Sequence, residues 1–403
     1  MSGPLVALAA KGAPDAHLTD QPEITYFKDG YKRYTNFSVS QIEQQFNSSV
    51  GYGRKITAVV SRNGDLINEM YFMLTLSALV NTGAAGLGDQ VYWTNSVGHA
   101  IIEFVEVEIG GHRFDRHQGD FMEIWETLSH PPDKGLGELV GFFTNTDDLV
   151  DFSSRDQTLF IPIRFWYNRF HAQALPLIAL QYHEVRINIK LRNRSELVIE
   201  EGGALSPDVG GGGEILDAKL LVNYVYLDTH ERRMFAQQPH EYLIDQLQFT
   251  GAEAKPSGKT RFNIPLFFNH PTQELIWVLQ KQTEIDNNRW FNYEGLTAGQ
   301  DGLVEAKIQL NGHDLFQERE AKYFRMVQPL EHHTRIPDKF IYDYSFALDP
   351  EDLRPSGSVN LSRIDNVTLV LETEDYQGEI RIYARSKNVM KIISGMAGLK
   401  YAN

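Results

Sequence analysis

Cysteine is missing from this chain of 403 residues, and no apolar run is long enough to cross a membrane as a helix. The absence of cysteine excludes a disulfide framework and a thiolate metal site, and it suits a protein that works in a reducing compartment. The N-terminal residues carry no basic leader ahead of a long apolar run, so we do not expect a secretory signal peptide.

Positive charge is also scarce. The chain has 38 lysines and arginines against 53 aspartates and glutamates, which gives a formal net charge of -15. Proteins that bind nucleic acid are usually basic, because much of their affinity comes from neutralising phosphates. We therefore expect no direct nucleic-acid partner. An acidic balance also favours solubility at high concentration, which suits a protein made in bulk.

Helical patterns are few and short. Apolar side chains recur at helical spacing over Phe121–Leu128, and a second short helix is predicted over Glu318–Gln328. Strand patterns dominate, and many strands with only occasional helices predict β-sandwiches or barrels. The clearest predicted strands are Lys55–Ser61, Met70–Leu79, Phe104–Ile109, Glu184–Arg192 and Glu214–Leu227. Within Phe104–Ile109 valine and isoleucine alternate with Glu106 and Glu108, which predicts one face in the core and one in water.

A weak internal repeat relates the two halves of the chain. The segment FVEVEIGGHRF around His112 returns as EAKIQLNGHDLF around His313, at an offset of 313 − 112 = 201 residues, and a predicted short helix follows each. A later strand over Val185–Ile189 also recurs at Val367–Leu371. The repeat predicts two similar sandwiches in tandem. Three copies of such a chain would present six similar units around one axis, a geometry that suits a hexagonal array.

The predicted organisation has four parts. Residues 1–24 form an N-terminal arm, 25–234 the first sandwich, 235–395 the second sandwich and 396–403 a C-terminal tail. The glycine-rich stretch Gly202–Gly213 resembles a linker, yet the strand that follows it is needed to close the first sandwich. We therefore interpret it as a long surface loop.

Two patterns suggest chemistry at first sight. The SGKT stretch at Ser257–Thr260 resembles a phosphate-binding loop, but Glu253 stands where that motif requires glycine and no helix is predicted to follow, so we expect a hairpin loop. The second pattern consists of histidines close to acidic residues. These residues are His112, His117 and His130 with Asp115 and Asp120, and separately His332 with His333.

We interpret these histidines as loop or interface residues. Adjacent side chains on a strand point to opposite faces, so His332 and His333 cannot easily share a metal ion. Protonation of the histidines near pH 6.5 could still tune assembly. The sequence therefore predicts no catalytic, cofactor-binding or metal-binding residue, and no cofactor.

Four segments resemble one protein family. They are Gln21–Ser38, Glu231–Leu243, Arg325–Arg363 and Asn388–Ala402, and they follow one another in the family's order over nearly the whole chain. The family is that of the major capsid proteins of nucleocytoplasmic large DNA viruses. The resemblance implies an all-β chain of two tandem eight-stranded jelly rolls, with a few short helices in loops.

The resemblance also implies a function. Homotrimers would act as pseudo-hexameric capsomers that tile the icosahedral shell of a large DNA virus, and the protein would not be an enzyme. Its partners would be other copies of itself, minor capsid and penton proteins and the internal virion membrane. The protein would be located in the virion and would be assembled in the cytoplasm of the infected host cell.

The most distinctive of the four segments, Arg325–Arg363, has a structural interpretation. Pro329 is predicted to break the helix before it, and the aromatic strand over Phe340–Phe346 follows. We expect this segment to shape a corner and to bury Tyr342, Tyr344 and Phe346, partly at the contact between the two sandwiches.

Two alternatives remain open at this point. A carbohydrate-binding or carbohydrate-cleaving sandwich would be a monomer or small oligomer with an aromatic-lined concave site. The 53 aspartates and glutamates are numerous enough to include a carboxylate pair suited to glycoside hydrolysis, although no spacing singles one out. A minor or spike protein of the same virion is the second alternative, and its abundance in purified particles would distinguish it.

Overall fold

The computed structural model describes residues 2–80, 90–201 and 211–401. The chain divides into two units, Met1–Asn36 and Phe37–Asn403. The first unit contains the short helices α1 (Gly3–Ala9) and α2 (Ala13–Thr19), each with a proline in its first turn, where the missing N–H has no cost. None of its described residues is buried, as expected for an arm without a core of its own.

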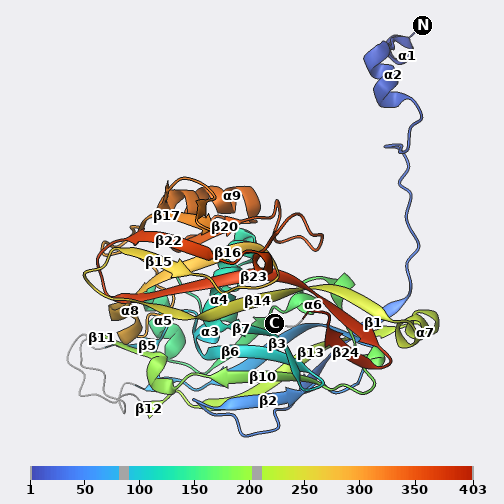
Figure 1. Cartoon of the computed structure of the whole chain (residues 1–403). Coiled ribbons are helices and arrows are strands. Elements are labelled where there is room, and N and C mark those ends of the chain that lie inside the picture. Colours follow the sequence, from blue (N-terminus) through green and yellow to red (C-terminus); the bar gives the residue numbers. More distant parts are fainter. Residues whose placement is uncertain (1, 81–89, 202–210, 402–403) are drawn as a thin grey trace. The chain divides into compact units, whose positions relative to one another are not determined.

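The second unit begins with a sandwich of two four-stranded antiparallel layers (Figure 1). One layer has the order β1 (Phe37–Gln44), β13 (Ile215–Leu227), β3 (Leu66–Leu76) and β8 (Gln157–Ile163), with β9 (Leu175–Pro176) also pairing with β3. The other has the order β2 (Lys55–Val59), β10 (Val185–Leu191), β6 (Ile102–Ile109) and β7 (His112–Gln118). Alternate residues of β3 face the core, with Phe72, Leu74 and Leu76 at 0% exposure.

A second sandwich follows the helix α7 (Thr229–Gln237). One layer has the order β14 (His240–Lys255), β23 (Gly378–Ile393), β16 (Pro271–Lys281) and β20 (Ile341–Ser345), and β21 (Val359–Asn360) and β24 (Met396–Leu399) extend it. The other has the order β15 (Arg261–Pro265), β22 (Val367–Thr373), β17 (Leu303–Leu310) and β18 (His313–Asp314), with β19 (Arg319–Glu320) pairing with β17.

Short elements lie between the main strands. Two small ribbons pair β5 (Gln90–Trp93) with β11 (Val198–Glu201) and β4 (Leu79–Val80) with β12 (Gly211–Gly212). The remaining helices are α3 (Val97–Ala100), α4 (Gly119–Ser129), α5 (Thr146–Ser153), α6 (Trp166–Arg169), α8 (Gln282–Asp286) and α9 (Gln328–His332). In the part of the chain that the structure describes, no helix combines the length and apolarity needed to span a bilayer.

The two sandwiches repeat one topology. Strands β1, β13, β3 and β8 correspond in order to β14, β23, β16 and β20, and β2, β10, β6 and β7 correspond to β15, β22, β17 and β18. The glycine turns of the sequence repeat fall at the same hairpin. Gly111 has φ +84 between β6 and β7, and Gly312 has φ +80 between β17 and β18, so both use the left-handed backbone that glycine permits. The later repeated strands are the equivalent β10 and β22. The chain is therefore two jelly rolls in tandem.

Each predicted strand coincides with an observed one, with small shifts at the ends. The strand after the glycine-rich stretch is β13, and it lies between β1 and β3 in its sheet. This position agrees with the prediction that the strand is needed to close the first sandwich. Residues 202–210 of that stretch lie outside the described residues, so the predicted loop is not seen there.

Four local expectations differ from the structure. Glu106 is only 5% exposed, because Lys55 and Arg116 cover it and each pairs with it at 2.6 Å. Burial alone would raise the pKa of Glu106, and these two cations bring it below its usual range. The prediction that Glu106 faces water is therefore wrong. The segment Ser257–Thr260 joins β14 to β15, which belong to different layers, so it is not a hairpin.

The predicted helix over Glu318–Gln328 is displaced along the chain. Residues Arg319–Glu320 form β19, and helical backbone runs through a π-helical turn at Tyr323–Val327 into α9. Pro329 is the second residue of α9, directly after the π-helical turn, and the helical backbone continues through it to His332, so it does not break the helix. At the C-terminus, Met396–Leu399 pairs with β23. The four-part division of the chain itself stays a prediction.

Candidate functional site: the contact between the sandwiches

Helix α4 is shared by the two sandwiches. It follows β7 directly, and it starts at Gly119, where any Cβ would fall well inside contact distance of two backbone carbonyl oxygens. Most of its residues are buried, including Phe121, Ile124 and Leu128 at the predicted helical spacing. A helix buried on nearly all sides needs partners around it, and here the second sandwich supplies those that the first does not.

Asp120 and Phe121 make the first contacts across the boundary. Asp120 pairs with Arg381 of β23 and, at 3.2 Å, with Arg192 of the first sandwich. The ring of Phe121 lies 5.5 Å from that of Tyr383. One carboxylate thus bridges cations of both sandwiches beside an aromatic contact that excludes water.

Glu123 makes the next contact. Its carboxylate accepts hydrogen bonds from His99 Nδ1 at 2.6 Å and from Ser96 Oγ at 2.9 Å, and it pairs with Lys339 of the second sandwich. Burial opposes ionisation, but the Lys339 ammonium and His99 together hold the pKa of Glu123 well below its usual range. The carboxylate is therefore charged, and its donors come from both sandwiches.

Two guanidinium groups lie over the ring of Trp125. Arg385 of β23 is 3.9 Å from its ring centroid and Arg169 of α6 is 4.8 Å from it. Cations over a tryptophan face are favourable, the more so where water is excluded. The indole thus connects a helix of the first sandwich to a strand of the second.

Asp245 organises the cations around this tryptophan. Its carboxylate lies 2.5 Å from Lys387 Nζ, 3.1 Å from Arg169 and 3.3 Å from Arg385. Burial would raise the pKa of Asp245, but the three cations lower it below its ordinary value. Arg385 also donates to Glu274 at 2.6 Å. An extended ion network therefore runs from α6 into β14, β16 and β23.

His333 lies at the end of this network. Its Nδ1 is 2.8 Å from Glu351, and its Nε2 is 3.3 Å from Glu274 and 3.2 Å from Asp343. Burial disfavours the charged imidazole, yet the surrounding carboxylates raise the pKa of His333 well above its usual value. His332 instead approaches the carbonyl oxygen of Leu348 at 3.0 Å. The two neighbouring histidines point apart, as predicted.

The other predicted histidines do not gather. His117 pairs with Asp115 at 2.9 Å, His130 pairs with Glu126 at 3.0 Å, and His112 is exposed. His117 lies in β7 and is buried, so it is not a loop residue. For the other two, the interpretation as loop or interface histidines stays a prediction.

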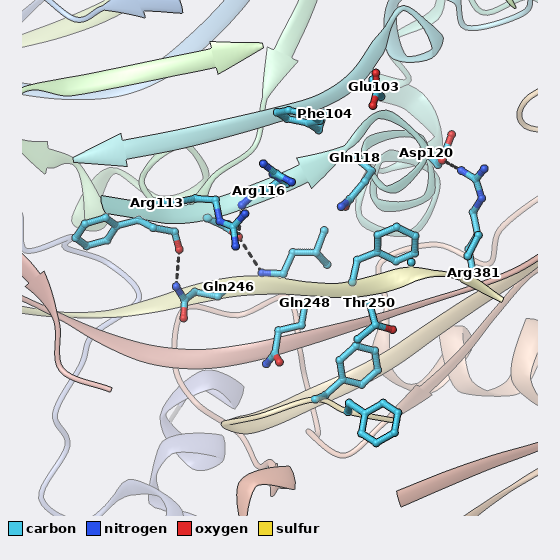
Figure 2. Close-up of a pocket in the computed structure, with 18 of the residues that line it drawn as sticks. Glu103, Phe104, Arg113, Arg116, Gln118, Asp120, Gln246, Gln248, Thr250 and Arg381 are labelled. Atoms are coloured by element: carbon cyan, nitrogen blue, oxygen red, sulfur yellow. Dashed lines mark hydrogen bonds and ion pairs between the residues drawn. The ribbon is translucent and has the colours of Figure 1, made fainter. Parts of the chain in front are cut away.

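A cleft of about 580 Å³ opens between β7 and β14, as Figure 2 shows. Two hydrogen bonds join its walls: Gln246 Nε2 donates to the carbonyl oxygen of Phe114 at 2.5 Å, and the Leu247 N–H donates to Asp115 at 3.0 Å. Its cations are largely engaged, since Arg116 and Arg381 both pair with carboxylates. The cleft thus contains polar groups that tie the sandwiches together.

The segment Arg325–Arg363 contacts the first sandwich through residues other than the predicted aromatic ones. Tyr342 is fully buried against Trp277 inside the second sandwich, and Tyr344 and Phe346 are half-buried. The inter-sandwich contacts come from His333, next to Trp125 with ring centroids 6.2 Å apart, and from Arg335 and Lys339. Tyr342 is buried, as predicted, but it does not lie at the contact between the two sandwiches, so that part of the prediction is wrong.

Sequence reasoning missed the ion network. Glu274 directly precedes the apolar run Leu275–Leu279 of β16 and is 0% exposed, whereas Asp245 and Arg385 lie in strands that carry other charges. The charge beside the apolar run is the available signal, because such a group needs a buried partner. Its partners are distant in sequence and cannot be inferred from spacing.

Comparisons with known proteins agree with this architecture. A model of the major capsid protein N-terminus matches residues 25–228, and one described as large eukaryotic DNA virus major capsid protein matches 231–398. The major capsid protein of Pyramimonas orientalis virus is 40% identical, with 100% of both chains covered. The crystal structure of PBCV-1 VP54 is 33% identical with a TM-score of 0.80, over 94% of this chain and 100% of that one. A quasi-atomic model of the PBCV-1 virus capsid has a TM-score of 0.79, at the same identity and coverage. The chain belongs to the major capsid protein family of large eukaryotic DNA viruses.

Proposed function

We propose that this protein forms homotrimers that act as pseudo-hexameric capsomers in the icosahedral shell of a large DNA virus. The observation that carries the proposal is the repeated strand order of the two sandwiches. Three chains with two similar units each offer six similar edges to neighbours, so a trimer can occupy a sixfold position.

The buried contact between the sandwiches supports this role. A capsomer needs its two units at one fixed angle, because neighbouring capsomers must meet at the same edges throughout the shell. Asp120 and Trp125 of α4 contact Arg381 and Arg385 of β23, and Glu123 contacts Lys339, which lies just before β20. Several well-separated contacts of this kind resist rotation better than a single contact.

No reaction is part of the proposal. The ionised groups of the contact are engaged with one another, which accounts for them without a substrate. We propose that the protein works through its packed interfaces, that it is located in the virion and that it is assembled in the cytoplasm of the infected cell, without direct contact to nucleic acid.

The arm suggests where further partners bind. Tyr26, Phe27, Tyr31 and Tyr34 are 91%, 98%, 86% and 84% exposed. Exposed aromatic residues that cluster along one segment are typical of surfaces that a partner covers. We propose that minor capsid and penton proteins, and the internal virion membrane, are the partners beyond other copies of this chain.

The oligomeric state tests the proposal directly. Light scattering coupled to size-exclusion chromatography should give three times the chain mass of 45.9 kDa. Negative-stain micrographs of the same fraction should show hexagonal outlines. A stable monomer at high protein concentration would contradict the proposal and would instead fit a carbohydrate-binding sandwich, which binding to immobilised glycans would then reveal.

A further inference from the structure

Three side chains with metal-ligating atoms converge beside the ion network. They are Glu274 of β16, His333 after α9 and Asp343 of β20, and one ligand atom of each lies within 4.8 Å of the others. Among the residues that the structure describes, this is the one such group of three. All three side chains are 0% exposed.

Several polar atoms of this group form no hydrogen bond of good geometry. They are His333 Nε2, Glu274 Oε2 and both carboxylate oxygens of Asp343, although His333 Nε2 lies within ion-pair distance of both carboxylates. A buried polar group without a hydrogen bond costs on the order of 1–3 kcal/mol, and more if it is charged. One such atom from each of the three residues faces the others within 4.8 Å, which indicates that a further group belongs between them.

The spacing of the atoms fits a metal ion better than direct contact. His333 Nε2 lies 3.3 Å from Glu274 and 3.2 Å from Asp343. Charge-assisted hydrogen bonds between nitrogen and carboxylate are shorter, at roughly 2.7–2.9 Å. Ligands at about 2.0–2.1 Å from a tetrahedral zinc ion are instead separated by roughly 3.3 Å.

The surrounding residues have the arrangement expected around a metal ligand. His333 faces Glu351 with its other nitrogen, Nδ1, at 2.8 Å, and a carboxylate in that position orients a ligating imidazole and increases its basicity. The other oxygen of Glu274 accepts from Arg385 at 2.6 Å, which leaves Oε2 directed to the centre. The ligand atoms are thus held in place without an ion.

The balance of ionisable groups also favours a cation. Glu274, Asp343 and Glu351 are three acidic side chains around His333, and Arg385 is the guanidinium that pairs with Glu274. A divalent cation would offset this excess of acidic groups.

We propose that Glu274, His333 and Asp343 bind one divalent cation, for which zinc fits the nitrogen and oxygen ligands best. The ion would clamp β16 and β20 to the segment that packs against Trp125, so its role is structural. Because the site is closed to solvent, the ion would enter as the chain folds.

Metal content of the full-length protein tests this proposal. We expect protein expressed with added zinc sulfate to retain about one zinc per chain after dialysis against EDTA, as measured by mass spectrometry of the elements. Refolding with Co²⁺ in place of zinc should give the visible absorption of a tetrahedral site. A folded wild-type protein without stoichiometric metal under both conditions would overturn the proposal and leave a protonated His333 as the occupant.

Variants locate the site. Asp343→Asn and His333→Gln should abolish retention, and Glu351→Gln should lower zinc affinity by about 10–100-fold through the outer contact. His332→Gln is the matched control and should keep the full zinc content. Equal zinc in the wild type and in a folded Asp343→Asn variant would also overturn the assignment. The capsomer proposal does not depend on this result, since trimers are measured separately.

Discussion

Replacing Lys339 by methionine tests whether the ion pair with Glu123 holds the two sandwiches together. The substitution keeps most of the side-chain length and removes the charge. Glu123, with a side chain only 7% exposed, would lose its partner from the second sandwich and keep His99 and Ser96. Removing one member of a buried pair costs about 3–5 kcal/mol. Because two donors remain, we expect a loss of about 2–3 kcal/mol in the free energy of unfolding.

Urea unfolding followed by tryptophan fluorescence, at one fixed protein concentration, measures this loss. Lys134→Met is the control, because Lys134 is exposed at the end of a short 3₁₀ helix and its substitution should change stability by less than about 0.5 kcal/mol. Adding Glu123→Gln should cost less in the Lys339→Met background than in the wild type, which gives a coupling energy for the pair. A loss below about 0.5 kcal/mol, or strict additivity, would refute the reasoning.

The pH dependence follows from the lowered pKa of Glu123. Unfolded glutamate titrates near pH 4.3, so the stabilisation by the pair is complete above about that value. It is lost only as pH falls through the lower pKa of the folded state. The difference between wild type and Lys339→Met should thus be constant from about pH 5 to 8 and shrink only in strong acid. A difference that disappears between pH 6 and 7 would implicate a histidine instead.

Three further predictions concern other parts of the structure. Gly378→Ala should lower the free energy of unfolding by about 1–3 kcal/mol, measured by thermal or urea unfolding, because its Cβ would collide with the carbonyl oxygen of Gln280. Gly398→Ala is the control and should be neutral, because a Cβ there meets no atom within 4 Å. Equal effects of the two substitutions would contradict this reasoning. Deleting residues 1–36 should leave the stability of the remaining chain within about 0.5 kcal/mol, because no described residue there is buried, and a larger loss would show that the arm packs. Trp125→Leu should cost about 1–3 kcal/mol through its two cation contacts, and an unchanged urea midpoint would argue against them.

The repeat and the strands could be predicted from the sequence because both depend on local periodicity. Alternation in β6 and β10 places valine and isoleucine in the core, and the glycine turns at Gly111 and Gly312 require a backbone that few other residues adopt. Comparing equivalent strands then predicts tandem sandwiches. These signals depend only on residues that are close to one another in the sequence.

The displaced helix before Pro329 shows where local signals fail. Proline usually ends or kinks a helix, yet here the helical backbone passes through Pro329 directly after a π-helical turn, and the local sequence does not reveal that turn. Glu106 is a similar case, since alternation places it on the outer face and Lys55 and Arg116 then bury it. Tertiary neighbours decided both outcomes.

The candidate site depended on the tertiary structure almost entirely. Glu274, His333 and Asp343 come from two strands and a loop, and neither their spacing nor their residue types mark them as a group. Periodicity determines which face of an element a residue occupies, but strand pairing and the packing of α4 determine which distant charges meet. By itself, therefore, the sequence determined two similar sandwiches, because repeated local patterns fold into repeated topology. Only the tertiary structure decided how the sandwiches are joined, because burying charges requires partners that the chain brings together from far apart.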